Sequence, residues 1–241
     1  MEKVLLVIGA SSDMGEALIE STYENYSVIL AHYRTMNEGL QVLKERLGEK
    51  LVLLQADLSH EEQVQGLIHE ISEMKLIPSH IVHFPAPICN NQKFHKIKWN
   101  VFQEEMDISL KSLILILQSF MPKMAKLKYG KVVLLLSFVI DGMPPKYCSN
   151  YVMTKYALLG LMKSLAVEYA DKGITVNGVS PAWVMTKYID NQPDFLVEQN
   201  AQLSPIGRNL LVSDIVPSIN WLLSDGADCV NGQNISITCG R

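Results

Sequence analysis

Tyr151 and Lys155 are the side chains in this sequence whose types and spacing best suit acid–base chemistry. They lie four residues apart, so a helix over 149–157 would place both on one face, one turn apart. A phenol has a pKa of about 10, and a neighbouring cation favours the phenolate and lowers that pKa. The pair could therefore exchange a proton with a carbonyl or an alcohol near neutral pH. The same spacing also arises by chance on solvated helix faces, so the rest of the sequence must decide between the two interpretations.

A glycine-rich turn follows the first apolar run of the chain. Such a turn between a strand and a helix directs backbone N–H groups and the positive helix end at a pyrophosphate. Gly9 permits the turn, and Gly15 allows the helix to pack closely on the strand. Asp13 stands where a third glycine would fit best; it either points inwards and repels a phosphate, or turns outwards and caps the helix in a capping box with Glu16. We predict a dinucleotide site formed by Gly9, Ser11, Ser12, Asp13, Met14 and Gly15.

The end of the second apolar run distinguishes between the two nicotinamide cofactors. An acidic residue about 20 positions after the turn would bind the ribose 2′-OH of NAD. No carboxylate occurs between Tyr26 and Asn37, and Arg34 and Thr35 stand there instead. Arg34 can pair with a 2′-phosphate, helped by the Thr35 hydroxyl, which favours NADP(H) over NAD(H). The alternative is that Arg34 is a solvated surface residue.

Short apolar runs alternate with segments of helical period along the whole chain. The predicted strands are 4–8, 28–33, 51–55, 81–84, 132–136, 174–179 and 234–238. The predicted helices are 14–24, 37–47, 61–74, 100–127, 149–171 and 213–223. Most strands are apolar throughout, as is typical of parallel strands covered on both faces. We predict one Rossmann-type, doubly wound α/β domain over residues 1–241, with a seven-stranded parallel sheet and helices on both faces.

The segment 182–212 shows no clear element. A stretch of this length in a compact domain is usually functional or partly helical. Its apolar side chains could cover a substrate or simply pack over the sheet edge; they are Trp183, Met185, Tyr188, Phe195 and Leu196.

The composition excludes several classes of protein and of site. A net charge of −4 gives no general attraction to nucleic acid. The four cysteines have no metal-site or disulfide pattern and are expected to be buried free thiols in a reducing compartment; they are Cys89, Cys148, Cys229 and Cys239. The six histidines form no ligand-spaced pair, so no metal is expected. No signal peptide and no bilayer-length apolar run is evident, so we expect a cytoplasmic protein without membrane contact.

Together these motifs resemble the short-chain dehydrogenase/reductase family, in the compact type that includes 3-oxoacyl-carrier-protein reductases. The resemblance covers essentially the whole chain. Its further segments, in the order the family has them, are Ala56-Asp57-Leu58, Leu135-Leu136-Ser137, the active-site helix 150–160, the sixth strand and cofactor loop 172–186, and the last strand 232–237.

The resemblance implies a role for each matching residue. Tyr151 would protonate the carbonyl oxygen as hydride arrives, and Lys155 would lower the Tyr151 pKa and hold the nicotinamide ribose. Ser137 would hydrogen-bond the substrate oxygen, where charge develops in the transition state. The cofactor contacts implied beyond the glycine-rich turn and Arg34–Thr35 come from Asp57, Leu58, Pro85, Ala86, Tyr151, Lys155, Pro181, Ala182, Val184 and Thr186.

Three positions depart from the family pattern. Asp13 replaces a fingerprint glycine. The segment 83–87, His-Phe-Pro-Ala-Pro, replaces the Asn-Asn-Ala-Gly whose amides brace the sheet and line the adenosine side. Ser109 replaces an asparagine that helps to hold a proton-relaying water behind the lysine, and is therefore expected in the catalytic group with a shorter reach. Pro181-Ala182 in place of Pro-Gly is a mild change.

These observations leave three functions to compare. The first is an NADPH-dependent reductase of a ketone, possibly a 3-oxoacyl thioester, whose reaction is reversible. The second is a cofactor-binding sensor or assembly partner with little catalysis, which the changes at positions 13, 84 and 109 favour and the intact Ser137, Tyr151 and Lys155 oppose. The third is dehydration or epimerisation by the same dyad, disfavoured because such relatives usually carry a larger C-terminal substrate region.

Two basic clusters bear on the substrate and on partners. The first contains Lys93, His95, Lys96 and Lys98, and the second contains Lys123, Lys126, Lys128 and Lys131. Either could attract the phosphates of a thioester substrate or an acidic carrier protein, and the alternative for each is a solvated surface. In relatives the helices matching 100–127 and 149–171 pair across a two-fold axis, which implies a homodimer or homotetramer.

Overall fold

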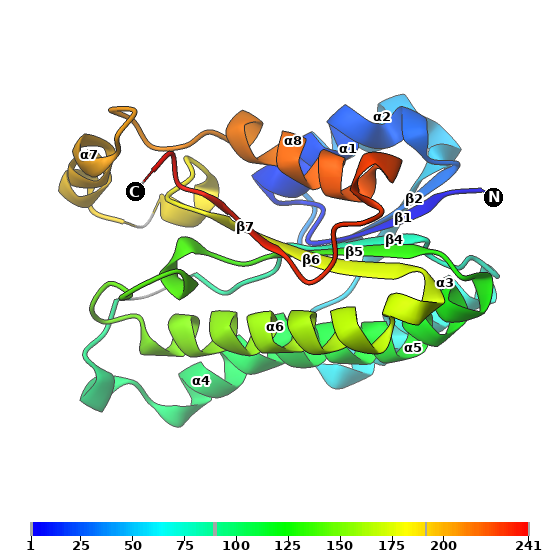
Figure 1. Ribbon diagram of the computed structural model, residues 1–241, viewed down its shortest axis with the longest axis horizontal. Coiled ribbons are helices and arrows are strands. Elements are labelled where there is room, and N and C mark those ends of the chain that lie inside the picture. The colour runs from blue at the N-terminus through cyan, green and yellow to red at the C-terminus, as the bar shows by residue number, and fades with distance from the viewer. Residues whose placement is uncertain (1, 89–90, 191, 241) are drawn as a thin grey trace.

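Seven parallel strands form one twisted sheet in the computed structural model, which describes residues 2–88, 91–190 and 192–240 (Figure 1). The strands are β1 (Val4–Ile8), β2 (Val28–Tyr33), β3 (Leu51–Gln55), β4 (His80–His83), β5 (Gly130–Leu135), β6 (Ile174–Pro181) and β7 (Asn234–Ile237). Their order is β3-β2-β1-β4-β5-β6-β7. The order reverses direction between β1 and β4, which is where a doubly wound sheet opens its ligand crevice. The predicted fold class is therefore confirmed.

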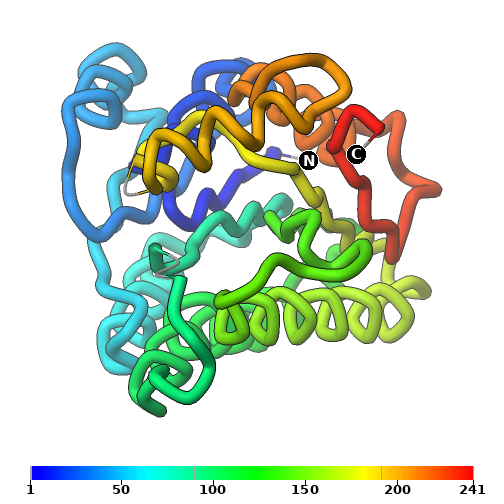
Figure 2. Tube along the Cα trace, turned by 90° about the vertical axis from the view of Figure 1, so that its left-hand side faces the viewer, coloured from blue at the N-terminus to red at the C-terminus, as the bar shows by residue number. Residues whose placement is uncertain are grey.

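Helices cover both faces of the sheet (Figures 1 and 2). One layer contains α1 (Asp13–Thr22), α2 (Glu38–Leu47) and α8 (Val212–Leu223). The other contains α3 (Glu61–Glu73), α4 (Trp99–Met106), α5 (Ser112–Leu127) and α6 (Ser149–Glu168). Each layer packs its own buried apolar cluster against the strands, because β1 to β6 present apolar side chains to both faces. The carboxyl ends of the strands meet at the end of the molecule that carries α7 (Asp194–Leu203), on the left of Figure 1.

Outside the helix predicted over 100–127, the predicted boundaries differ from the observed ones by at most three residues, at helix ends and at the ends of β4 to β7 alike. The first three strands have the predicted bounds. The helix predicted over 100–127 is interrupted, because a π-helical turn, η4 (Asp107–Lys111), separates α4 from α5. The segment 182–212 contains α7, which has little apolar periodicity of its own. Its Phe195 side chain is 67% exposed, so that residue does not cover a buried site in this chain.

The helical stretch Trp99–Leu127 is long and apolar enough to cross a membrane by length and composition alone. The sequence shows no single apolar run of that length, so this result differs from the expectation. Half of the most apolar window is buried inside the fold. A core helix passes the same test, and α5 packs seven buried side chains against the sheet and α3.

The expectation of buried cysteines is right for one residue and wrong for two. Cys148 is buried, whereas Cys229 and Cys239 are exposed in the C-terminal segment. Cys89 lies outside the described residues. Free thiols without a disulfide agree with the spacing, but their burial could not be read from it.

Candidate active site

Tyr151 and Lys155 lie on consecutive turns of α6, as their spacing predicts. The Lys155 side chain is buried, and its Nζ donates a 2.7 Å hydrogen bond to the carbonyl of Leu135, the last residue of β5. The same Nζ lies 5.4 Å from the centroid of the Tyr151 ring. Burial lowers the pKa of Lys155 to about 8, and the Glu105 carboxyl acts in the opposite direction. Lys155 is therefore mostly charged at neutral pH and close to its own titration.

Ser137 lies close in sequence to the carbonyl that holds Lys155. It stands two residues after Leu135, in extended backbone with φ −166°, where β5 ends and a short turn begins. Its side chain is 6% exposed. The end of β5 thus supplies both the carbonyl that holds Lys155 and the predicted oxyanion-binding hydroxyl.

Tyr188 connects the two loops on either side of this dyad. Its hydroxyl donates a 3.0 Å hydrogen bond to the carbonyl of Pro87, in the loop after β4. Its ring centroid lies 6.4 Å from that of Tyr151. Within the apolar set expected to cover the substrate, Tyr188 is therefore the member that reaches the dyad, whereas Met185 is 46% exposed.

The predicted nicotinamide loop follows β6 directly. Pro181 ends the strand, and the Ala182 N–H donates 2.9 Å to Ile237 of β7. Val184 is 7% exposed and forms a parallel bridge with Leu210. Thr186 Oγ1 donates 3.4 Å to the Val184 carbonyl, so the loop is held at both ends.

The glycine-rich turn has the conformation that its sequence requires. Gly9 has φ +85°, which favours glycine, and a Cβ on Gly15 would lie 2.5 Å from the Gly9 carbonyl oxygen. Of the two alternatives for Asp13, capping of α1 is wrong, because Ser12 is the N-cap: its Oγ accepts from the Gly15 N–H at 3.1 Å and donates to the Gly9 carbonyl at 2.7 Å. Asp13 is instead the first residue of α1, and Met14 is buried behind it.

The Asp13 carboxylate points across to the loop after β6. It accepts a 2.7 Å hydrogen bond from the backbone N–H of Lys187, and the Lys187 ammonium lies 3.8 Å away. Its charge is thus partnered by a cation from the opposite side of the crevice. This arrangement joins the turn after β1, which includes Ser11, to the loop that contains Thr186.

His32 supports the turn from β2, a role the sequence did not suggest. Its Nδ1 accepts from the Gly9 N–H at 3.1 Å, so Nε2 carries the proton and donates 3.0 Å to the Ala56 carbonyl. Burial lowers the pKa of His32 to about 4 and keeps the ring neutral. One neutral imidazole therefore links the glycine-rich turn to the Ala56-Asp57-Leu58 segment. A histidine in an otherwise apolar strand was the signal that could have identified it.

Arg34 and Thr35 are exposed where β2 ends. The Arg34 guanidinium makes no hydrogen bond or salt bridge to any described residue, although its charge helps to lower the pKa of Asp57. The Asp57 carboxylate accepts from the N–H and the hydroxyl of Ser59. Leu58 beside it is buried. The guanidinium is thus free to meet an anion at this edge.

The loop after β4 passes against Gly9. A Cβ on Gly9 would lie 3.3 Å from Pro85 Cγ and 3.4 Å from Phe84 Cβ, so this glycine also permits a close approach. Pro85 and Ala86 are half-buried at the crevice, whereas Phe84 is buried in the core. Phe84 therefore fills by packing a position where the family uses an amide.

A buried polar interface lies behind Lys155, between α4–η4 and α6. We call it the α4–α6 seam and define it by Glu105, Ser109, Asn150 and Thr154, which are all buried. The amide of Asn150 donates 3.2 Å to Glu105 Oε2. Burial raises the pKa of Glu105 to about 7 against the opposing effect of Lys155. Ser109, expected from the sequence in the catalytic group, lies in this seam. Glu105 was missed by the sequence analysis; it stands four residues before Ser109.

These residues fit a dinucleotide. The Asp13 and Met14 N–H groups at the start of α1 have no intrahelical acceptor, and the turn that carries them follows β1, whose neighbour in the sheet is β4. The Asp13 carboxylate, which could have repelled a phosphate, is held by Lys187. The structure groups no three His, Cys, Asp or Glu side chains as a metal site among its described residues.

Comparison with known proteins finds similarity to reductases along nearly the whole chain. The family model described as enoyl-(acyl carrier protein) reductase matches residues 9–241. The 3-oxoacyl-(acyl-carrier-protein) reductase of Staphylococcus aureus is 30% identical over 244 residues, covering 100% of this chain and 98% of that protein. Two solved structures share the fold: ElxO with NADP bound (TM-score 0.87, 22% identity, 100% of this chain and 98% of that one) and a 3-oxoacyl-(acyl-carrier protein) reductase from Brucella melitensis (TM-score 0.88, 21% identity, 99% and 91%).

Proposed function

Since the chain belongs to the short-chain dehydrogenase/reductase family of oxidoreductases, we propose that it reduces a ketone to an alcohol with NADPH and with Tyr151 as the general acid. The single observation that carries the proposal is the buried Lys155 ammonium, held 5.4 Å from the Tyr151 ring by the carbonyl at the end of β5. A cation in that position favours the Tyr151 phenolate. We further propose that residues 1–241 act as one domain.

In this proposal each of three side chains has one role. The bound cofactor would supply a hydride to the carbonyl carbon. Ser137 would donate a hydrogen bond to the carbonyl oxygen as negative charge develops on it. Tyr151 would give its proton to that oxygen, and Lys155 would stabilise the phenolate that remains.

We propose NADPH rather than NADH because of the edge beyond β2. Arg34 is exposed and makes no hydrogen bond or salt bridge to a described residue, and Thr35 beside it is also exposed. A guanidinium binds a phosphate through charge-assisted, often bidentate hydrogen bonds. The relative ElxO was solved with NADP bound, which agrees with this preference.

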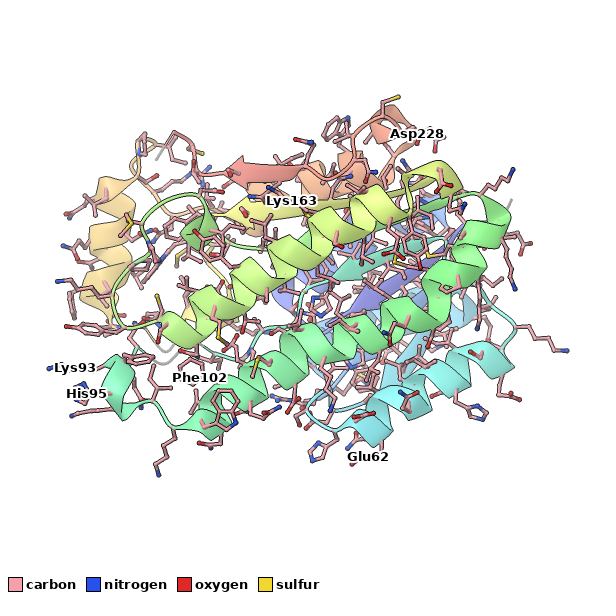
Figure 3. The ribbon with its side chains drawn as sticks, turned by 60° about the horizontal axis from the view of Figure 1, so that its bottom comes forward. Glu62, Lys93, His95, Phe102, Lys163 and Asp228 are labelled. Atoms are coloured by element: carbon pink, nitrogen blue, oxygen red, sulfur yellow. The ribbon has the colours of Figure 1, made fainter. Side chains whose placement is uncertain are left out.

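We propose a 3-oxoacyl thioester as the substrate class, as the names of the relatives suggest. Lys93 and His95 of the first basic cluster line a surface pocket of about 440 Å³ together with Lys146. Ser149, two residues before Tyr151, also lines this pocket. Figure 3 shows Lys93 and His95 projecting outwards at one end of the molecule. The first cluster is therefore the better site for substrate phosphates or an acidic carrier protein.

The second basic cluster is smaller than the sequence suggests. Lys131 is buried and pairs with Asp228 at 2.5 Å, so it adds no charge to the surface. Lys123 is half-buried and donates to Ser72. Lys126 and Lys128 remain exposed where α5 ends, and Figure 3 shows Asp228 at the end of the molecule opposite Lys93.

We propose a homo-oligomer built on α6. Its outer face exposes Met153, Tyr156 and Val167, the last with 81% of its surface accessible. Figure 3 shows Lys163 on the same helix. Apolar side chains repeated on one helix face favour pairing with a second copy.

The function is tested by NADPH consumption with a panel of ketones and 3-oxoacyl thioesters. We expect turnover by the wild type and a loss of about a thousandfold in kcat for Tyr151→Phe, since a general acid contributes about 10² to 10⁴ in rate. Circular dichroism and NADPH affinity should be unchanged in that variant. NADPH binding without turnover on any substrate would refute the reductase and favour a cofactor-binding protein with little catalysis.

The carrier site is tested by reversing charge. Lys93→Glu with Lys146→Glu should raise KM for a carrier-bound substrate by about tenfold and leave a small ketone unaffected. The matched control, Lys126→Glu with Lys128→Glu, reverses the same number of charges at the far end of the molecule. It should leave KM unchanged for both substrates. Equal effects of the two pairs would contradict the assignment of the pocket.

A further inference from the structure

The α4–α6 seam brings two pairs of polar side chains face to face inside an otherwise apolar layer. Glu105 and Ser109 stand four residues apart on α4 and η4, and Asn150 and Thr154 stand four residues apart on α6. All four are buried, between 0% and 3% exposed. The π-helical turn at η4 changes the helix register here, and such turns occur frequently at functional sites.

Most of the polar atoms in the seam lack a hydrogen-bonding partner among the described residues. The Asn150 amide donates to Glu105 Oε2 at 3.2 Å. Glu105 Oε1, Ser109 Oγ, Asn150 Oδ1 and Thr154 Oγ1 are buried without a partner. Each such atom costs about 1–3 kcal/mol. A seam kept only for stability would be apolar, so this arrangement points to a use.

Glu105 is coupled to the proposed catalytic lysine. The Lys155 charge lowers the pKa of Glu105, and the Glu105 charge raises the pKa of Lys155. Burial acts on both in the opposite sense and leaves them at about 7 and about 8. The two pKa values therefore lie much closer together than those of a free carboxyl and a free ammonium group, which lowers the free-energy cost of passing a proton between them. Glu105 is the carboxyl group with a raised pKa among the described residues.

We propose that Glu105 is the proton reservoir of Lys155, connected through the polar atoms of the seam and standing in for the relay asparagine that Ser109 replaces. This inference rests on the proposed reductase function. A water bound by Glu105 Oε1, Ser109 Oγ and Asn150 Oδ1 would have three polar partners, as buried waters usually do. Glu105 touches neither substrate nor cofactor, so it is a positioning residue that acts through Lys155.

The proton balance is simple. After Tyr151 has protonated the alkoxide, its phenolate takes a proton from the Lys155 ammonium. The neutral Lys155 amine takes a proton from the Glu105 carboxyl. The Glu105 carboxylate is then reprotonated from solvent, so each turnover consumes one proton and changes no other charge.

Few other charged groups face these two. Glu104 on the same helix raises the pKa of Glu105. From β4, the fully buried His83 faces Lys155, and burial lowers the pKa of His83 to about 3, so it stays neutral during the cycle. From α6, Lys155 is the titratable group that acts on Glu105.

The first test measures the titration of Glu105 directly and needs no cofactor. Infrared difference spectra between pH 5 and pH 9 should show the C=O stretch of one protonated carboxylic acid that disappears near pH 7 and is missing in Glu105→Gln. In Lys155→Met the same band should persist to higher pH, because the cation that lowers the Glu105 pKa is gone. No such band in the wild type, or an unchanged midpoint in Lys155→Met, would overturn the proposal.

The second test asks whether the proton is used. Glu105→Gln keeps the shape of the side chain, and we expect kcat for ketone reduction to fall by about tenfold at pH 7.5 with KM unchanged. The wild-type inflection in kcat near pH 7 should be lost. Adding Ser109→Asn to Glu105→Gln should restore kcat to within about threefold, which a merely structural role would not explain.

The outcomes separate this inference from the proposed function. A wild-type inflection retained in Glu105→Gln, or no rescue by Ser109→Asn, overturns the reservoir while leaving the reductase intact. Absence of turnover by the wild type overturns the reductase, and the infrared titration then still decides the protonation of Glu105. Melting temperatures of the three variants identify any change caused by misfolding, and Lys155→Met provides the infrared test if Glu105→Gln does not fold.

Discussion

The glycine-rich turn and the α4–α6 seam each carry a departure from the family pattern, and the structure treats them differently. At the turn, Asp13 replaces a glycine, and its carboxylate accepts from the Lys187 backbone while a cation lies 3.8 Å away. In the seam, Ser109 replaces an asparagine, and its hydroxyl is buried without a partner among the described residues. The polar group of the replacing residue therefore has partners at the turn and has none among the described residues in the seam.

Two buried histidines differ in the same way in their hydrogen-bond partners. His32, under the turn, uses both ring nitrogens in hydrogen bonds to Gly9 and Ala56. His83, which faces Lys155, has no described partner for either nitrogen. An unpartnered polar group in a core costs stability, so it is expected where chemistry uses it. The comparison suggests that the turn serves binding and the seam serves proton transfer.

Of the effects that compare the two regions, the largest is expected at Lys155, in front of the seam. Lys155→Met should lower kcat by about a hundredfold or more, because it removes the cation that favours the Tyr151 phenolate. Steady-state rates with NADPH and a ketone measure this. The control is Lys163→Met, two turns along the same helix and exposed, which should keep kcat within about twofold. A similar loss in both variants would mean that α6 is sensitive to any lost charge, and the assignment would fail.

The next effect belongs to the turn side and should appear in affinity rather than in rate. Arg34→Gln should raise the Kd of NADPH by about 10- to 100-fold, since a charge-assisted hydrogen bond contributes about 1.5–3 kcal/mol. The Kd of NADH should change little, because NADH has no 2′-phosphate. Fluorescence titration with both cofactors measures the ratio. An equal change for both would show that Arg34 does not bind the 2′-phosphate.

Lowering the pH should destabilise the folded protein through His83. The pKa is about 3 for folded His83 and about 6.5 for an unfolded histidine, so between these values the unfolded state binds the extra proton. Stability is therefore complete above pH 6.5 and falls as the pH decreases, by about 1.4 kcal/mol per unit for this group. Urea unfolding should show that the wild type loses about 2 kcal/mol more than His83→Leu between pH 6.5 and pH 5.

At pH 7.5 the same measurement compares the two regions. His83→Leu should change stability by less than about 1 kcal/mol, because it removes two unpartnered nitrogens. His32→Leu should cost about 2 kcal/mol, because it leaves the Gly9 N–H and the Ala56 carbonyl unpaired. Equal costs would show that His83 has a partner in solution.

The smallest effect is expected when a serine is changed to alanine in each region. Ser12→Ala should lower the free energy of unfolding by about 1 kcal/mol, because it removes the N-cap of α1. Ser109→Ala should cost less, because its hydroxyl has no described protein partner and loses at most a contact with a bound water. Thermal unfolding of the two variants measures the difference. An equal loss in the two variants would mean that the seam is held by the Ser109 hydroxyl, and the contrast would disappear.

The sequence by itself determined the sheet, the glycine-rich turn and the dyad. Local patterns specify these features: continuous apolar runs define parallel strands, and a four-residue spacing on a helix defines neighbours. For this reason the bounds of β1, β2 and β3 were predicted without error. Helix ends were less certain, because Ser12 and Asp13 are both good capping residues and only the backbone shows which one caps.

The tertiary structure alone decided which polar groups are buried and what they meet. Lys131 looked like a surface lysine and is buried beside Asp228, 97 residues away. Glu105, which the sequence analysis did not single out, lies against Asn150, 45 residues away. Burial and long-range pairing depend on how elements pack, and no local spacing encodes them. The sequence thus singled out Tyr151 as the proposed proton donor, and only the packing of α4 on α6 placed Glu105 in the buried seam.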